Sequence, residues 1–202
     1  MSNILTLNEY KNSRIIVMGS LQGEYYKLID FLYNQDFNYK DILIFTGDFI
    51  NFDNKESSQL ISFIKENKNV LSVKGYNEKL FIDSIDTNRT IHTKFDYSED
   101  DIDFLRKLPL IVELNNTLYI VNSGFNFELR DDLQEPDYTI FKTNKPFDSD
   151  WYNKKSPGIT FCFTNNTFNK CKVNAGYNLG DINTKLHAIV FYKEYDPIII
   201  DL

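Results

Sequence analysis

Short apolar runs that end at a glycine alternate with helically spaced segments in the first half of the chain. Residues 14–18 form one such run before Gly19, and residues 23–35 then place Tyr26, Ile29, Leu32 and Tyr33 at helical spacing. The pattern returns as an apolar run at 41–46, a helical segment at 57–67 and a further run at 69–74. Strands that alternate with helices predict parallel βαβ units.

The second half of the chain is richer in strand-like segments. Ser98 and Asp101 have the spacing of a capping box, which predicts a helix that continues to Lys107 and stops before Pro109. Beyond it, apolar segments separated by turn residues predict strands at 110–113, 118–121, 158–164, 172–174, 186–191 and 198–201. We expect both halves to join one mixed-sheet core, with functional loops at the strand ends.

Composition favours one globular domain spanning residues 1–202. The chain is 42% hydrophobic and contains no linker rich in proline and glycine. Its formal net charge of −7 argues against nonspecific nucleic-acid binding, which needs a basic surface. No segment is apolar enough for a membrane span or a signal peptide, so we expect a cytoplasmic protein that does not bind membranes. Cys162 and Cys171 fit neither a disulfide framework nor a zinc site and are interpreted as buried thiols.

Glycine motifs stand at the ends of three predicted strands: VMGSLQG at 17–23, FTGDFIN at 45–51 and VKGYNE at 73–78. Together they resemble the calcineurin-like metallophosphatase superfamily, whose pattern reads GDxHG, then GDxxD, then GNH followed by an acid. The resemblance to the family continues through residues 108–126 and 161–167. Residues 174–191 are similar to the closing strands of phosphoprotein phosphatases and bacterial diadenosine tetraphosphatases. The whole resemblance covers about residues 13–201 and implies an α/β fold, a mixed β-sheet sandwich flanked by helices.

The same resemblance implies a two-cation site in which most ligand positions are altered. In the family, two divalent ions about 3.5 to 4 Å apart activate a water and clamp the phosphate, held by Asp, His and Asn side chains. The bridging aspartate is retained as Asp48, whereas the other ligand positions hold Ser20, Gln22, Tyr76, Asn122 and Asn166. The second aspartate of GDxxD is Asn51, and the histidine that it orients as a general acid is Asn77. The arginine that holds phosphate is replaced by Phe52.

These replacements predict a vestigial cleft. Without cations, an aspartate at position 20 would repel Asp48, and Ser20 removes that repulsion. Neutral amides can fill the histidine volumes and hydrogen-bond to one another. Protonation of a leaving group needs a titrating side chain such as histidine, yet His92 and His187 lie outside the motifs. We therefore interpret the chain as a catalytically inactive pseudophosphatase, with no cofactor and no catalytic residue expected.

An active enzyme is the alternative interpretation. It would be a metal-dependent phosphoesterase, acting on phosphoproteins or dinucleoside polyphosphates through an atypical, reduced metal site. In this alternative, one Mg²⁺ or Mn²⁺ ion would be held weakly by side-chain oxygen atoms of Gln22, Asp48, Asn122 and Asn166.

An inactive protein would bind a phosphorylated ligand, a nucleotide or a protein partner in the cleft. Main-chain amides at the Gly23 and Gly47 turns suit an anion, and Lys74, Lys79 or Arg89 could add positive charge. A third hypothesis places a partner surface in the aromatic segment 125–152, which contains Trp151; a self-packed lid loop is the competing interpretation. Heavy use of Asn, Ile, Lys, Phe and Tyr is typical of AT-rich genomes, and a viral source would place the protein in the host cytoplasm.

Overall fold

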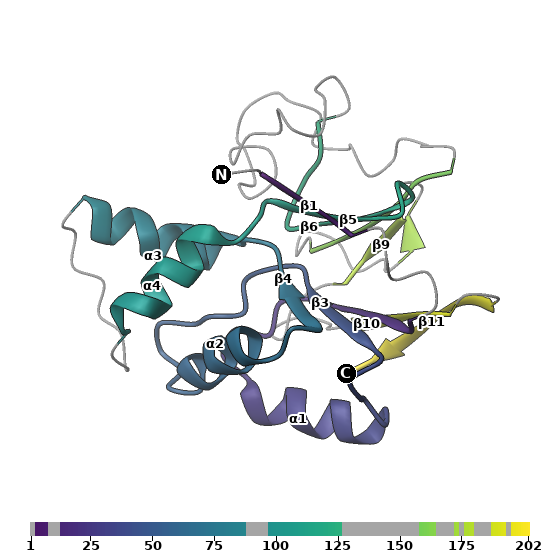
Figure 1. The fold of residues 1–202 in the computed structure, drawn as a ribbon, viewed down its shortest axis with the longest axis horizontal. Coiled ribbons are helices and arrows are strands. Elements are labelled where there is room, and N and C mark those ends of the chain that lie inside the picture. Colours follow the sequence, from purple (N-terminus) through teal and green to yellow (C-terminus); the bar gives the residue numbers. More distant parts are fainter. Residues whose placement is uncertain are drawn as a thin grey trace.

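Two mixed β-sheets pack face to face, and the helices gather around one of them (Figure 1). The computed structural model describes residues 3–7, 13–87, 97–126, 158–164, 172–173, 176–179, 187–192 and 195–202. The expected α/β fold, a mixed β-sheet sandwich flanked by helices, is confirmed. The sequence pattern alone suggested a single mixed sheet. The strands instead divide between the two layers of the sandwich.

The sheet next to the helices, called the helix-side sheet below, has the strand order β11-β10-β2-β3-β4. Its parallel strands are β2 (Ile15–Met18), β3 (Ile42–Phe45) and β4 (Val70–Ser72). The antiparallel strands β10 (His187–Tyr192) and β11 (Tyr195–Asp201) complete it. Helices α1 (Tyr25–Asn34) and α2 (Ser57–Glu66) cross over between the parallel strands, so the predicted βαβ units are confirmed.

The second sheet has the strand order β1-β5-β6-β7-β9-β8. Its strands are β1 (Ile4–Leu7), β5 (Ile111–Leu114), β6 (Leu118–Val121), β7 (Thr160–Phe163), β8 (Lys172–Val173) and β9 (Gly176–Asn178). Helices α3 (Tyr76–Asp86) and α4 (Glu99–Lys107) lie between β4 and β5 along the chain. The predicted capping box is present, since Ser98 Oγ accepts the Asp101 N–H at 3.1 Å and the Ser98 N–H reaches Asp101 Oδ2 at 3.2 Å.

Alternating side chains of the helix-side sheet enter two different hydrophobic cores. Ile16, Met18 and Phe45 pack with the helices, whereas Val17 and Ile44 pack with the second sheet. β2 and β3 are therefore buried on both faces, which explains why their sequences are apolar throughout. A further cluster on the second sheet joins aromatic side chains of β6, β7 and the segment after β6.

Some details differ from the sequence pattern. The buried face of α1 consists of Leu28, Phe31 and Leu32, while Tyr26 and Tyr33 are exposed, because the helix turns its side without hydroxyl groups toward the sheet. β1 and β9 were not expected, because β1 is not a continuous apolar run and β9 has only three residues; β1 forms by pairing with β5, and β9 by pairing with β7. Cys162 is a buried free thiol, as expected, and Cys171 lies outside the described residues. Within the described ranges, no helix is long and apolar enough to cross a membrane.

Candidate functional site

The three glycine motifs meet where the parallel strands β2, β3 and β4 end, because carboxyl ends of parallel strands lie at one sheet edge. The turns are joined directly: the Gln22 N–H reaches the Asp48 carbonyl at 3.0 Å, and the Gly23 N–H reaches the Phe49 carbonyl at 2.8 Å. The turns after β3 and β4 are closer still. A Cβ atom on Gly75 would lie 2.2 Å from the Asp48 nitrogen, so only glycine fits there.

Asp48 is the centre of the site, and both of its carboxylate oxygens accept N–H groups. Oδ1 accepts the main-chain N–H of Asn77 at 2.8 Å, and Oδ2 accepts Nδ2 of Asn122 at 3.2 Å. The same Asn122 nitrogen donates to the Thr46 carbonyl at 2.7 Å. Since a carbonyl can only accept, this contact fixes the orientation of the Asn122 amide, and Ser123 Oγ completes it by donating to Oδ1 at 2.8 Å.

A second acid, Glu78, lies fully buried beneath the turns. Its carboxylate accepts the main-chain N–H groups of Asp48 and Gly75, each at 2.8 Å, and of Ile50 at 3.0 Å. Burial, reinforced by the nearby Asp48 carboxylate, raises the pKa of Glu78 to about 8, although the N–H donors oppose the shift. The sequence identified Glu78 only as the acid that follows the glycine motif and missed its role as the acceptor that joins these turns.

Ser20 belongs to a buried cluster of hydroxyl groups. Its Oγ lies 3.5 Å from Thr164 Oγ1, and Thr164 Oγ1 lies 2.6 Å from Thr46 Oγ1. The Thr164 N–H also donates to the Asn122 carbonyl at 2.7 Å. Thr46 and Thr164 were missed by sequence reasoning, but each is the last residue of a predicted strand, a position that could have indicated them.

Asn51 and Asn77 make separate contacts. Asn77 Nδ2 donates to the Ile50 carbonyl at 2.8 Å, and Asn51 Oδ1 accepts the Asp53 N–H at 2.9 Å within its own turn. The main chain of Asn51 exchanges hydrogen bonds with Ser57 Oγ at the start of α2. These amides therefore bond mainly to the main chain, where the sequence suggested contacts between amide side chains.

The remaining predicted site residues lie at the edge of this arrangement or outside it. Gln22 is partly exposed and has a left-handed main chain with φ of 48°. Tyr76 opens helix α3 and is 42% exposed. Asn166 lies outside the described residues, as do His92, Arg89 and Trp151. His187 is buried in β10, consistent with a structural role.

The cations expected near an anion site are engaged elsewhere. Lys74 Nζ donates to the Arg106 carbonyl at 2.9 Å, and Lys79 Nζ pairs with Asp83 at 2.6 Å on the next helical turn. The Gly23 amide already donates to a carbonyl. The expectation that Lys74, Lys79 and the Gly23 amide would be available for an anion is therefore not met.

The residues present do not fit a pair of divalent cations. Metal ligands must offer lone pairs, and Asn122 instead directs an N–H group at Asp48. Each oxygen of Asp48 and of Glu78 accepts at least one N–H group, so a cation would have to share these oxygens with hydrogen-bond donors. Among the residues that the structure describes, no group of three His, Cys, Asp or Glu side chains comes together. No catalytic step through a metal can be assigned to this arrangement.

Comparison with known proteins supports the fold. No protein-family sequence model matches the chain, and no curated protein sequence matches it. Solved structures do match. One, of a protein provisionally assigned as a diadenosine tetraphosphatase, has a TM-score of 0.79 and 19% identity, with 100% of this chain and 98% of that chain covered.

Two further structures are more distant. A protein serine/threonine phosphatase from Saccharomyces cerevisiae has a TM-score of 0.60 and 13% identity, with 100% of this chain and 84% of that chain covered. A metallophosphoesterase from Sphaerobacter thermophilus has a TM-score of 0.58 and 10% identity over 95% of this chain and 88% of that chain. The two-sheet sandwich, its parallel βαβ units and these matches together show that the chain has the fold of the calcineurin-like metallophosphatase superfamily.

Proposed function

We propose that this protein is a catalytically inactive metallophosphatase-like protein, a pseudophosphatase that works by binding. The observation that carries the proposal is the pair of N–H donors on the Asp48 carboxylate, supplied by Asn77 and Asn122. A cation at Asp48 would meet the N–H group that the buried Asn122 amide directs at Oδ2, and this amide would then point at a positive charge. Hydrogen bonds take the place of metal bonds in this cleft.

Among the site residues that the structure describes, none is placed to protonate a leaving group. Asn77, at the position of the general acid in the family, is a neutral amide whose nitrogen is bound to the Ile50 carbonyl. Glu78 titrates near neutral pH, but it is fully buried and its oxygens face main-chain amides. It is therefore a structural acid and has no route to a substrate.

Among the expected partners, a protein fits this cleft better than a free phosphate or nucleotide. Turn amides can hold an anion, but the amides of Asp48, Ile50 and Gly75 are already taken by Glu78. Tyr76 stands exposed at the start of α3, and tyrosine is typical of the central contacts in protein interfaces.

The proposal is tested by assaying the purified protein with an aryl phosphate and Mn²⁺, Mg²⁺ or Ni²⁺, with bound metal measured by elemental analysis. We expect no turnover above that of the buffer with metal, and the same background for Asp48→Asn. Stoichiometric binding of two ions, with turnover that is lost in Asp48→Asn, would overturn the proposal. Turnover with one bound ion would instead establish the alternative, a phosphoesterase with a reduced metal site.

A separate titration tests the preference for a protein partner. AMP and phosphoserine are added to isotope-labelled protein, and the side-chain amide signals of Asn77 and Asn122 are followed by NMR. We expect neither ligand to shift these signals at millimolar concentration, about the limit of weak specific binding. Saturable shifts of both signals would show that the cleft still captures phosphate.

A further inference from the structure

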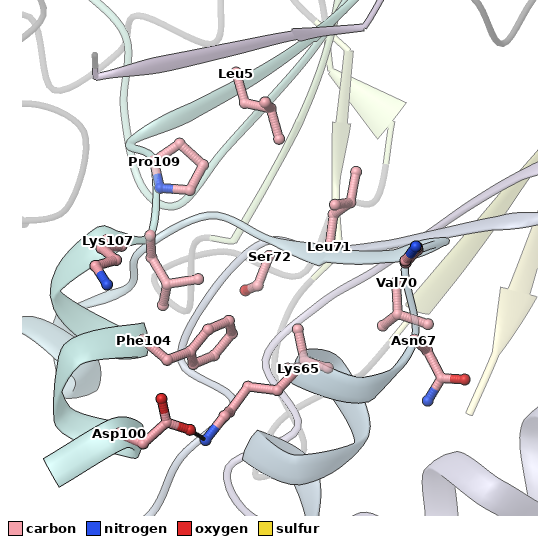
Figure 2. Close-up of a pocket in the computed structure, with 13 residues that line it drawn as sticks. Leu5, Lys65, Asn67, Val70, Leu71, Ser72, Asp100, Phe104, Lys107 and Pro109 are labelled. Atoms are coloured by element: carbon pink, nitrogen blue, oxygen red, sulfur yellow. Dashed lines mark hydrogen bonds and ion pairs between the residues drawn. The ribbon is translucent and has the colours of Figure 1, made fainter. Parts of the chain in front are cut away.

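A groove with a volume of about 460 Å³ lies between helices α2 and α4 and strand β4, and no residue of the Asp48 site lines it. Leu5 of β1 and Pro109 border it on the side of the second sheet (Figure 2). Volumes of about 300 to 1,000 Å³ are typical of sites for small molecules. The groove therefore has room for a small ligand and is separate from the cleft of the proposed function.

The groove does not offer a strand edge to a partner. Val70 and Ser72 of β4 are only 2% and 3% exposed. The next N–H along this edge, that of Lys74, donates to the Pro109 carbonyl at 2.7 Å. The connection between α4 and β5 thus covers the edge of β4, so binding in the groove must depend on side chains.

Apolar side chains from two hydrophobic cores line the groove. Phe104 of α4 packs against the core under the helices, whereas Leu5 of β1 and Leu71 of β4 pack against the core between the two sheets (Figure 2). All three side chains are only partly buried, so each still presents apolar surface to the groove. A ligand with an apolar body would remove this surface from water, and that burial favours binding.

The charged side chains at the groove leave an excess of positive charge. Among the described residues, Asp100 is the one acid that lines it, and Asp100 is paired with Lys65. Lys68 and Lys107 also line the groove; both are exposed, and neither forms an ion pair with any described residue. Two uncommitted positive charges therefore stand beside an apolar interior, in a protein whose formal net charge is −7.

We propose that this groove binds a small amphipathic anion, a molecule with an apolar chain or ring and one anionic group. The apolar body lies against Phe104 and the partly buried leucines, and the anionic group lies at the rim, in the positive potential of Lys68 and Lys107. A cationic ligand would meet these lysines as like charges, and a neutral apolar ligand would leave them unused. The site is independent of the Asp48 cleft, so either proposal can fail without the other.

The probe is decanoate, added to isotope-labelled protein below the concentration at which it forms micelles. The methyl signals of Leu5 and Leu71, which line the groove, are followed by NMR, and Val121 of a separate hydrophobic cluster is the internal control. We expect saturable shifts of the two leucine signals and no shift of Val121. Octanoate should bind about tenfold more weakly than decanoate, because two fewer methylene groups would be buried.

Charge variants test the role of the rim. Lys68→Gln with Lys107→Gln should weaken decanoate binding by about tenfold. The matched control, Lys40→Gln with Lys55→Gln, removes the same charge and should weaken binding by less than about twofold, because both lysines are exposed and do not line the groove. Lysines near helix ends also offset the helix dipole, so thermal unfolding in the same buffer checks that each variant is folded.

Four results would overturn the proposal. Decylammonium has the same chain length as decanoate and should bind at least about tenfold more weakly; equal binding would remove the role of the lysines. Equal affinity for octanoate and decanoate would exclude insertion of the apolar chain. Equal weakening in both pairs of lysine variants, or shifts that include Val121, would reduce the effect to general association with the surface. Absence of saturable binding up to about 5 mM would also overturn it.

Discussion

The carboxylate of Glu78 accepts the main-chain N–H of Asp48 at 2.8 Å, so an acid of helix α3 is bonded to the turn that carries the second acid. Glu78 belongs to α3, and its other contacts are to Ile50 and Gly75. One buried side chain thus joins the turns after β3 and β4 to the helix that follows them. The following predictions start from this arrangement.

Removing the Glu78 carboxylate should destabilise the protein strongly. Glu78→Ala leaves the N–H groups of Asp48, Ile50 and Gly75 without their acceptor in a buried position. We expect the free energy of unfolding to fall by about 3 kcal/mol or more. Urea unfolding measures the loss. Glu78→Gln is the control, because its remaining oxygen still accepts some of these groups, and an equal loss in both variants would contradict the role assigned to the carboxylate.

Stability should fall as the pH rises through neutrality. Burial and the Asp48 carboxylate raise the pKa of Glu78 to about 8 from its ordinary value of 4.5. Between these values the folded protein holds a proton that the unfolded chain has released, so the associated stabilisation is complete below about pH 4.5 and is lost as the pH rises through about 8. Urea unfolding at several pH values measures this slope. Glu78→Gln should flatten it, and an unchanged slope would assign the effect to other groups.

A Cβ atom on Gly47 should be far more costly than one on Gly158. Both glycines have a left-handed main chain, with φ of 86° and 76°. A Cβ on Gly47 would lie 2.6 Å from the Gly75 nitrogen, whereas one on Gly158 has no neighbour within 4 Å. Gly158→Ala should therefore cost about 1 kcal/mol from main-chain strain alone, and Gly47→Ala several times more. Similar melting temperatures for the two variants would refute the close contact between the turns.

A negative charge at position 122 should be poorly tolerated. Asn122→Asp keeps the shape of the side chain but places an oxygen against the Thr46 carbonyl and the Asp48 carboxylate, in a fully buried site. We expect a loss of about 3 to 5 kcal/mol in the free energy of unfolding at neutral pH. Asn116→Asp, in the exposed turn after β5, is the matched control and should change stability by less than about 0.5 kcal/mol. Addition of Mn²⁺ should not restore the Asn122→Asp variant; recovery with metal would indicate a functional cation site.

The sequence predicted the parallel half of the fold well because its strands are continuous apolar runs and its helices are long enough to show a period. β2, β3, α2 and the capped start of α4 all lie within a few residues of their predicted positions. β1 could not be predicted in the same way, because its four residues form a strand only through pairing with β5, more than a hundred positions away. The division into two sheets likewise depends on long-range pairing, which periodicity does not encode.

The motif positions predicted where the site lies, but they predicted few of the contacts that its side chains make. The glycine turns brought Asp48, Asn77 and Asn122 together, so the positions were useful guides. Asn77 donates its main-chain N–H, and Glu78 accepts the main-chain N–H groups of the turns. Both contacts depend on where α3 starts and on φ angles that residue identity does not fix. The hydroxyl contact between Thr46 and Thr164 joins residues 118 positions apart and required the packed sandwich to be seen.

The two donors on Asp48 come from different layers of the molecule, Asn77 from the helix after β4 and Asn122 from the end of β6. The hydrogen bonds on Asp48 therefore link the helix after β4 to the second sheet. A change of Asn122 toward an ion-binding side chain would remove one of these donors before enough ligands existed to hold an ion, whereas a change of the Asn77 side chain would leave its main-chain donor in place. Under the proposed function, recovery of hydrolysis would therefore have to pass through a variant that is weakened at Asn122.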